Sequence, residues 1–279
     1  MTVTPVTDPT PSARIRVQGT PAQLVAHDIT RVYVGRGSSV TAVEPLDFSL
    51  DPKSAVGIIG ESGSGKSTLS RILVGLETPT TGSVTFNGTP IQDLLRSSEG
   101  RREFRSAVQY VAQDTSSSFD PRRTLGDAVA TPLRVLRGVT GQAATDRLDE
   151  IASALRLDPA FYSRLPSAVS GGQRQRFALA RALVVRPRIL LCDEVVSALD
   201  VSVQGAVLNL IKDYVHEHDI GLAFVSHGLP ATAFISDELV IMRNGHVVER
   251  GTTESIVLHA KDDYTRSLLA AYRKSGGRS

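Results

Sequence analysis

The strongest chemical signal in the sequence is a glycine-rich segment, Gly60-Glu61-Ser62-Gly63-Ser64-Gly65-Lys66-Ser67, which fits the pattern G-x-x-x-x-G-K-[ST]. Glycines at these places let backbone N–H groups turn toward phosphate oxygens, and the helix that follows adds the favourable dipole of its N-terminus. In such a loop Lys66 reaches the β- and γ-phosphates and the Ser67 hydroxyl ligates Mg²⁺. An apolar run precedes the segment and a helical pattern follows it, so we predict a nucleotide phosphate site here.

Two carboxylates end a second apolar run, Ile189-Leu190-Leu191-Cys192-Asp193-Glu194. A buried strand that simply emerges into a charged loop would look the same. Beside a phosphate loop, however, a carboxylate at the end of the adjacent strand can hold the water shell of Mg²⁺, and we predict this role for Asp193. The second carboxylate can orient and deprotonate an attacking water, the role predicted for Glu194.

A third pattern, Ser170-Gly171-Gly172-Gln173, opens a helix. Ser170 is a good N-cap, and the two glycines leave backbone donors uncovered. The segment is therefore either a capped helix without a ligand or a second phosphate-binding helix end. One γ-phosphate approached by two separate helix ends favours a site shared between two subunits.

The predicted elements around these segments alternate between strand and helix. Residues 1–21 are rich in Pro, Thr and Ser and predict a flexible tail. We expect strands at 24–30, 40–50, 55–59, 82–88, 189–192 and 221–226, with a hairpin around Asn244-Gly245. We expect helices at 66–76, 125–136, 145–157, 172–185 and 203–217. Residues 115–169 show little strand signal and predict a helical insert.

Composition excludes several classes of protein. Of the 279 residues 41% are hydrophobic and 22% charged, as in ordinary globular proteins. A net charge of +2 argues against a nucleic-acid binder held by overall charge. One cysteine, Cys192, closes no internal disulfide, which fits a reducing compartment. We find no apolar run of about 20 residues and no signal peptide in residues 1–11, so we expect a cytoplasmic chain that meets a membrane only through partners.

Together these motifs resemble the ATP-binding subunits of ABC transporters, from Leu24 to about Tyr272. The resemblance includes Gln113 in Val-Ala-Gln-Asp, the signature from Val169 to Gln173, Ser197-Ala198-Leu199-Asp200, and His227. It implies an α/β fold: a RecA-like P-loop core with an antiparallel β subdomain and an inserted helical subdomain at about 115–170. Residues 22–272 would form a single nucleotide-binding domain and residues 273–279 a basic C-terminal tail.

The resemblance also implies residue roles. Gln113 would link Mg²⁺ to the membrane-facing groove, and His227 would contact the γ-phosphate. Asp200 would lie in the dimer-contact loop and Tyr33 would stack on adenine, although a lone Tyr near a strand is often only a packing residue. The remaining cofactor-binding residues would be Gly60, Glu61, Ser62, Gly63, Ser64, Gly65, Lys66, Ser67, Thr68, Ser170, Gly171, Gly172 and Gln173. The metal ligands would be Ser67, Gln113 and Asp193, with Glu194, His227 and Gln113 as catalytic residues.

A narrower resemblance is to the branch that imports dipeptides, oligopeptides and nickel. It is carried by the phosphate loop, by Phe119-Asp120-Pro121-Arg122 and by Asp263-Tyr264-Thr265-Arg266-Ser267-Leu268-Leu269. The chain departs from this branch at Gly228, where the branch usually has Asp directly after the histidine that corresponds to His227. It also departs at Val195, where the branch usually has Pro. It also lacks the branch's cysteine-bearing C-terminal extension.

These resemblances imply an ATPase subunit that binds ATP and Mg²⁺ and energises peptide import from the cytoplasmic face of the membrane. Its partners would be a second, related ATPase subunit or a second copy of the chain, two membrane permease subunits and, indirectly, an extracytoplasmic solute-binding protein, with no nucleic acid. The alternatives are the same role for nickel or another small solute, and a non-transport ABC ATPase. A P-loop kinase or GTPase is disfavoured by the signature Ser170–Gln173.

Overall fold

In the computed structural model of the chain, residues 24–35, 37–114, 118–196 and 201–276 are described. The strands are β1 (Leu24–Gly35), β2 (Ser38–Leu50), β3 (Ala55–Ile59), β4 (Thr81–Phe86), β5 (Thr89–Pro90), β6 (Val108–Val111), β7 (Ile189–Asp193), β8 (Gly221–Ser226), β9 (Glu238–Arg243) and β10 (His246–Thr252). The α-helices are α1 (Lys66–Leu73), α2 (Ile91–Arg96), α3 (Ser98–Ala107), α4 (Leu125–Pro132), α5 (Gln142–Ala154), α6 (Gly171–Leu183), α7 (Val201–Glu217), α8 (Leu229–Ile235), α9 (Thr253–His259) and α10 (Asp263–Gly276). A π-helical turn, η1 (Leu133–Arg137), and two 3₁₀ turns, η2 (Pro159–Phe161) and η3 (Pro166–Ala168), complete the elements.

The larger sheet has the strand order β10-β9-β3-β8-β7-β6 and is parallel except for its edge strand β10. Strands β7 and β8 are buried along their whole length. This explains why their sequences are continuous apolar runs rather than alternating apolar and polar residues. The chain leaves the carboxyl ends of β3, β7 and β8 at Gly60, Glu194 and His227. Three of the predicted functional segments therefore meet at one edge of the sheet, where ligands of open α/β sheets bind.

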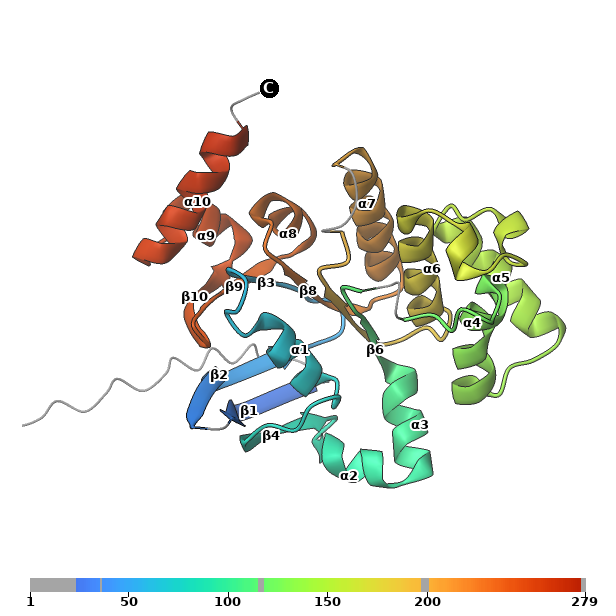
Figure 1. Cartoon of the computed structure of the whole chain (residues 1–279), viewed down its shortest axis with the longest axis horizontal. Coiled ribbons are helices and arrows are strands. Elements are labelled where there is room, and N and C mark those ends of the chain that lie inside the picture. Colours follow the sequence, from blue (N-terminus) through green and yellow to red (C-terminus); the bar gives the residue numbers. More distant parts are fainter. Residues whose placement is uncertain (1–23, 36, 115–117, 197–200, 277–279) are drawn as a thin grey trace, which may run out of the picture.

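The smaller sheet is antiparallel, with the order β2-β1-β4-β5. Helix α1 packs between the two sheets (Figure 1). Its Leu69 and Ile72 share one core with Phe48 of the small sheet and Ile58 of the large one. This core fixes the first turn of α1, and with it the phosphate loop, relative to both sheets.

The helical part of the chain between β6 and β7 lies on the opposite side of the molecule from α10 (Figure 1). Its helices α4 and α5 pack on α6 and α7 through a shared core. The helix expected at 125–136 is α-helical only as far as Pro132 and continues as the π-helical turn η1. Proline has no N–H to donate, which removes one regular hydrogen bond at this place, and Gly138, with φ +68°, then ends the helix.

Several elements were not expected from the sequence. Strand β6 is short and half-polar, and the helical patterns identified in the sequence do not include α8, α9 or α10. Helix α10 runs to Gly276, so the backbone of residues 273–276, expected in a C-terminal tail, is helical. The expected N-terminal tail, residues 1–21, lies outside the described residues.

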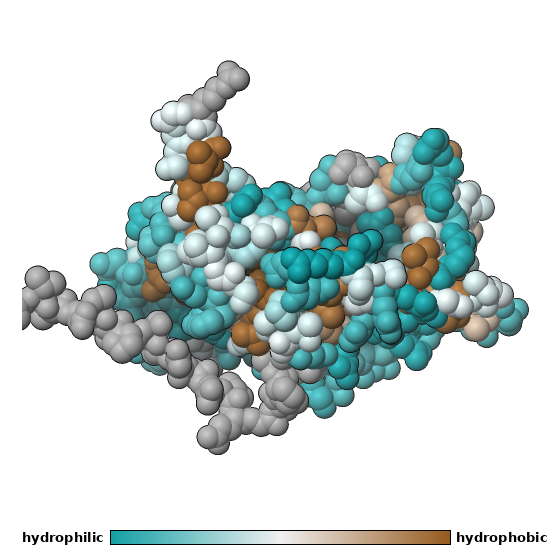
Figure 2. Space-filling view, turned by 90° about the horizontal axis from the view of Figure 1, so that it is seen from below, coloured by the Kyte–Doolittle hydropathy of each residue, from teal (hydrophilic) through white to brown (hydrophobic). Residues whose placement is uncertain are grey.

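Within the described ranges, no helix is both long and apolar enough to cross a membrane. On the face shown in Figure 2, apolar side chains form small patches separated by polar surface.

Candidate nucleotide site

A cavity of about 800 Å³ opens at the carboxyl end of β3. It is lined by Tyr33, Val40, Ala42, Gly60, Glu61, Ser62, Gly63, Gly65, Lys66, Ser67, Thr68, Arg71, Gln113, Glu194, His227, Leu268 and Tyr272. The cavity thus brings the phosphate loop together with four residues predicted from distant segments, namely Tyr33, Gln113, Glu194 and His227.

Two glycines of the phosphate loop are required by close backbone contacts. A Cβ atom at Gly60 would lie 2.2 Å from the carbonyl oxygen of Met242, and one at Gly65 would lie 2.1 Å from that of Ala42. Gly65 also has φ +100°, in the region that favours glycine. The loop therefore keeps its shape only with glycine at both positions.

Lys66 is 4% exposed, and its ammonium group is held by the loop itself. Nζ donates to the carbonyl oxygens of Gly60 and Glu61, each at 2.8 Å, and approaches Ser64 Oγ at 3.4 Å. Burial lowers the pKa of Lys66, and the nearby carboxylate Glu194 acts in the opposite direction. The result is a buried cation at the base of the cavity, which matches an anionic ligand.

Asp193 lies at the end of β7 with only 2% of its surface exposed. Its Oδ1 accepts a hydrogen bond from Ser67 Oγ at 3.2 Å, and its Oδ2 accepts one from the Tyr110 hydroxyl at 2.9 Å. Burial raises the pKa of the Asp193 carboxyl, while these two hydrogen bonds act to lower it. A buried carboxylate beside a hydroxyl, at the edge of a phosphate loop, is the oxygen donor set that Mg²⁺ prefers.

The described residues contain no cluster of three or more His, Cys, Asp or Glu side chains that could hold a metal ion alone. Ser67 and Asp193 supply two protein oxygens, and the predicted third ligand, Gln113, lines the same cavity. A magnesium ion here would therefore depend on phosphate oxygens and water for its other ligands, as Mg²⁺ commonly does in nucleotide sites.

Glu194 adopts φ +50°, a left-handed conformation that is uncommon for residues other than glycine. Its N–H donates to Val225 O on the neighbouring strand β8 at 2.8 Å, which holds the residue in this conformation. The carboxylate accepts a 2.7 Å hydrogen bond from Gln113 Nε2 and lies 3.6 Å from His227 Nδ1. Strained residues of this kind concentrate at functional sites.

Tyr33, on β1, is 39% exposed at the rim of the cavity. Its hydroxyl donates to the Glu77 carboxylate, and the Arg31 guanidinium lies 4.7 Å from the ring centroid. Arg31 also donates to Glu77 at 2.8 Å. The ring is therefore held in a fixed orientation by a cation and a carboxylate.

The segment Ser170–Gln173 does not line the cavity. Ser170 Oγ accepts from Gln173 N at 3.2 Å, and Gln173 Oε1 accepts from Ser170 N at 2.9 Å, which makes a complete capping box for α6. A Cβ atom at Gly171 would meet nothing within 4 Å. Asp200, predicted for the dimer contact, lies outside the described residues.

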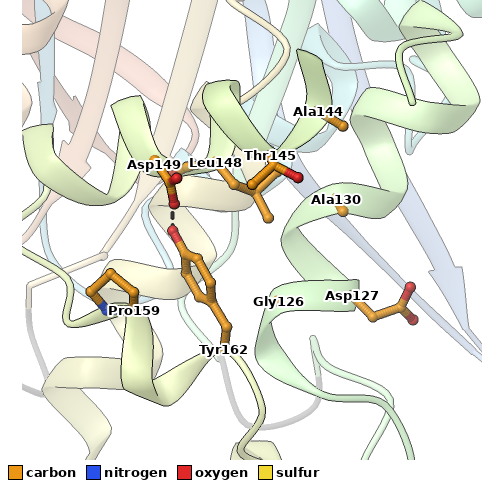
Figure 3. Close-up of a pocket in the computed structure, with 9 residues that line it drawn as sticks. All are labelled: Gly126, Asp127, Ala130, Ala144, Thr145, Leu148, Asp149, Pro159 and Tyr162. Carbon is orange, nitrogen blue, oxygen red and sulfur yellow. Dashed lines mark hydrogen bonds between the residues drawn. The ribbon is translucent and has the colours of Figure 1, made fainter. Parts of the chain in front are cut away.

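A second cavity, of about 370 Å³, lies in the helical part of the chain between α4, α5 and η2 (Figure 3). Its lining includes Ala130, Leu148 and Tyr162, and the Tyr162 hydroxyl donates to Leu148 O at 2.9 Å. None of the predicted site residues lines it.

Comparison with known proteins identifies the family. Residues 43–197 match the ABC transporter family. The chain belongs to that family. It is 37% identical to the di/tripeptide transport ATP-binding protein DppF of Pseudomonas aeruginosa, over 89% of this chain and 78% of that protein. It is 38% identical to the glutathione import ATP-binding protein GsiA of Escherichia coli K12, over 91% of this chain and 42% of GsiA, so it spans less than half of that relative.

A solved structure agrees with this assignment. The post-hydrolysis dimer of the ATP-binding cassette MJ0796, bound to ADP and Pi, superposes with a TM-score of 0.76 at 28% identity, covering 82% of this chain and 98% of that one. The predicted family, its peptide-importer branch and the RecA-like ABC fold are thereby confirmed. The chain is an ABC ATPase.

Six residues of the site were not identified as site residues by sequence reasoning: Val40, Ala42, Arg71, Tyr110, Leu268 and Tyr272. Arg71 follows Ser67 by four residues on α1, and that spacing puts both on one helix face. Tyr110 reaches Asp193 because β6 pairs with β7. Leu268 belongs to the segment Asp263–Leu269 that resembles the importer branch, but no local signal assigns Leu268 or Tyr272 to the site, since only the packing of α10 brings them to the cavity.

Proposed function

We propose that the chain is the subunit that binds and hydrolyses ATP in an ABC importer of di- and oligopeptides. The observation that carries the catalytic part is the position of Glu194, between Gln113 and His227 at the mouth of the phosphate-loop cavity. The similarity to DppF over most of both chains supports the importer role.

ATP binding would use the phosphate loop and Tyr33. The backbone N–H groups of Gly60–Thr68 and the Lys66 ammonium would hold the phosphates, and Tyr33 would stack on adenine. Ser67 and Asp193 would hold Mg²⁺, with Gln113 as a third ligand. When bound, the ion neutralises charge on the β- and γ-phosphate oxygens.

In hydrolysis, the oxygen of a water molecule forms a bond to the γ-phosphorus and the bond to the ADP oxygen breaks. Glu194 would accept the proton of that water, and Gln113 holds its carboxylate in place through the 2.7 Å hydrogen bond. His227, on the other side of Glu194, would contact the γ-phosphate. Positioning and charge stabilisation account for most of the rate in such reactions.

The complete site would need a second subunit. Ser170–Gln173 form a capped helix end with open space at Gly171, yet they do not line their own chain's cavity. They would bind the γ-phosphate in the partner's site, with Asp200 at the contact, so that two ATP molecules close the dimer. Because ATP binds the closed state better than the open one, closure would drive two permease subunits at the cytoplasmic face of the membrane. The partner would be a related ATPase subunit or a second copy.

The solute is tested by transport. Deleting the gene in its host should abolish uptake of a labelled dipeptide, and the wild-type gene, but not Glu194→Gln, should restore it. Measuring glutathione and Ni²⁺ uptake in the same strains distinguishes these two solutes from dipeptides. Glutathione is included because of the similarity to GsiA. Unchanged dipeptide uptake after deletion, with loss of one of the other solutes, would reassign the cargo. Unchanged uptake of all three would count against the importer role.

A further inference from the structure

Helix α10 places three side chains, each four residues from the next, against the loops of the nucleotide site. Leu268 and Tyr272 line the cavity itself. One turn earlier, the Tyr264 hydroxyl accepts a 3.1 Å hydrogen bond from the backbone N–H of Glu61 in the phosphate loop. Residues four apart lie on the same face of a helix, so this single face contacts the site along two turns.

Tyr272 makes the more specific contact. Its hydroxyl donates to the carbonyl oxygen of His227 and accepts a hydrogen bond from the N–H of Leu229. Leu229 is the first residue of α8, where a helix leaves its N–H groups without partners inside the helix. Burial raises the pKa of Tyr272, so the phenol stays neutral and able to donate.

The two backbone groups that Tyr272 binds lie on either side of Gly228. This glycine is the N-cap of α8 and supplies no side-chain cap. Glycine is the least restricted residue, so the chain at this point has little conformational preference of its own. Other local restraints include a 2.9 Å bond from Gly228 N to Ser226 Oγ, and bonds to Gly228 O from Thr232 Oγ1 at 2.8 Å and from Thr232 N at 3.2 Å.

The position of His227 depends on this short segment. Its side chain is 59% exposed, and the 3.6 Å separation of its Nδ1 from the Glu194 carboxylate is therefore not enforced by tight packing around the ring. A restraint on the backbone directs the imidazole toward Glu194 and the cavity without tight packing around the ring.

We infer that Tyr272 is a positioning residue for His227: its hydroxyl fixes the backbone from His227 to Leu229 and so holds the imidazole beside Glu194. Through Tyr264 the same helix also contacts the phosphate loop, so α10 joins the two loops that face the γ-phosphate. The inference rests on the proposed function, because the contact between Tyr272 and His227 affects catalysis only if the chain hydrolyses ATP.

The contact is tested first without ATP, by hydrogen exchange of the full-length chain. Tyr272→Phe keeps the ring and removes only the hydroxyl, so amides of the peptide 227–232 should exchange about threefold to tenfold faster. The matched control is Tyr162→Phe, which removes a hydroxyl that also donates to a backbone carbonyl, in the helical part of the chain (Figure 3). Equal exchange of this peptide in wild type and Tyr272→Phe would overturn the inference.

The role in catalysis is tested by steady-state ATP hydrolysis of the full chain assembled with its transporter partners. Tyr272→Phe should lower kcat about threefold to tenfold and leave the KM for ATP within about twofold, whereas Tyr162→Phe should change neither. In a His227→Ala background, Tyr272→Phe should cause no further loss of kcat, because its effect passes through His227. An equal loss in that background would refute the positioning role. A wild type that hydrolyses no ATP would count against the proposed function, while the exchange measurement still decides whether the contact exists.

Discussion

The side-chain amide of Gln113 donates a 2.7 Å hydrogen bond to the carboxylate of Glu194, although the two residues are 81 positions apart in the chain. Gln113 follows β6 and Glu194 follows β7, and these strands pair in parallel, so the bond joins two loops at the carboxyl edge of the sheet. His227, after β8, approaches the same carboxylate from the next strand. The carboxylate is thereby held by Gln113 and faces His227 at 3.6 Å.

Glu194→Gln should leave ATP binding intact and lower the turnover of the assembled transporter about 10²- to 10⁴-fold, the usual contribution of a general base. It should also accumulate the closed, ATP-bound dimer, because ATP can bind but is not cleaved. ATPase assays and size-exclusion chromatography with ATP measure both effects. Glu254→Gln, at an exposed carboxylate on α9, is the control and should behave as wild type. Near-normal turnover of Glu194→Gln would remove Glu194 from the role of base.

Lys66→Ala and Gly171→Asp should impair different steps, ATP binding in the first variant and ATP hydrolysis in the second. Lys66→Ala removes the buried cation of the phosphate loop and should abolish ATP binding by the isolated chain. Gly171→Asp fits the fold, since a Cβ there meets nothing within 4 Å, and should spare that binding. It should block hydrolysis in the dimer by placing a negative charge against the partner's γ-phosphate. Loss of ATP binding by the isolated Gly171→Asp chain would contradict a site shared between subunits.

Asp193→Asn should stabilise the free chain at neutral pH. Burial raises the pKa of Asp193 in the folded state above its unfolded value. The folded protein therefore becomes less stable as the pH rises above the unfolded pKa and through the folded one. Asparagine carries no such charge, and the melting temperature at pH 7 without Mg²⁺ should rise by about 2–4 °C for each kcal/mol recovered.

This difference between Asp193→Asn and wild type should shrink toward pH 4, where the unfolded carboxyl also takes up its proton. Stabilisation by Mg²⁺ with ATP should be lost in the variant. Calorimetry over a pH series checks both, with the exposed Asp213→Asn as control. A melting temperature below that of wild type at pH 7 would show that the hydrogen bonds from Tyr110 and Ser67 outweigh the cost of burial.

Gly228→Asp should be tolerated and should raise turnover modestly. The backbone at Gly228 has φ −94°, which any residue adopts, and a Cβ would lie 3.5 Å from Ser226 Oγ. The new carboxylate can cap α8, which has no side-chain cap, and this adds a few tenths of a kcal/mol of stability.

Turnover of Gly228→Asp with the natural partners should rise modestly, within the about 1–3 kcal/mol that a charge-assisted hydrogen bond across the dimer contributes. Gly228→Ala is the matched control, because it restricts the backbone without adding charge. Equal turnover in wild type and Gly228→Asp would mean that the glycine is neutral or compensated by a partner residue.

The sequence by itself was sufficient for the phosphate loop, the buried strands and the family. The loop can be recognised from the sequence alone because all its groups come from one continuous segment, Gly60 to Ser67. In that segment the glycines, the lysine and the serine each have a defined role in phosphate or Mg²⁺ binding. Strands β3 and β8 were predicted with their observed bounds, because strands buried on both faces are continuous apolar runs. Strand β6 was not predicted, because two of its four residues are only half-buried and its sequence is therefore not a continuous apolar run.

Only the tertiary structure decided which distant residues complete the site. Tyr110 reaches Asp193 through strand pairing, and Tyr272 reaches His227 through the packing of α10, so neither contact leaves a pattern in the local sequence. The left-handed conformation of Glu194 likewise depends on its bond to β8, a strand that lies about thirty residues later in the chain. Motifs record local geometry, whereas these contacts follow from the order of strands in the sheet and from the helix that packs against its edge.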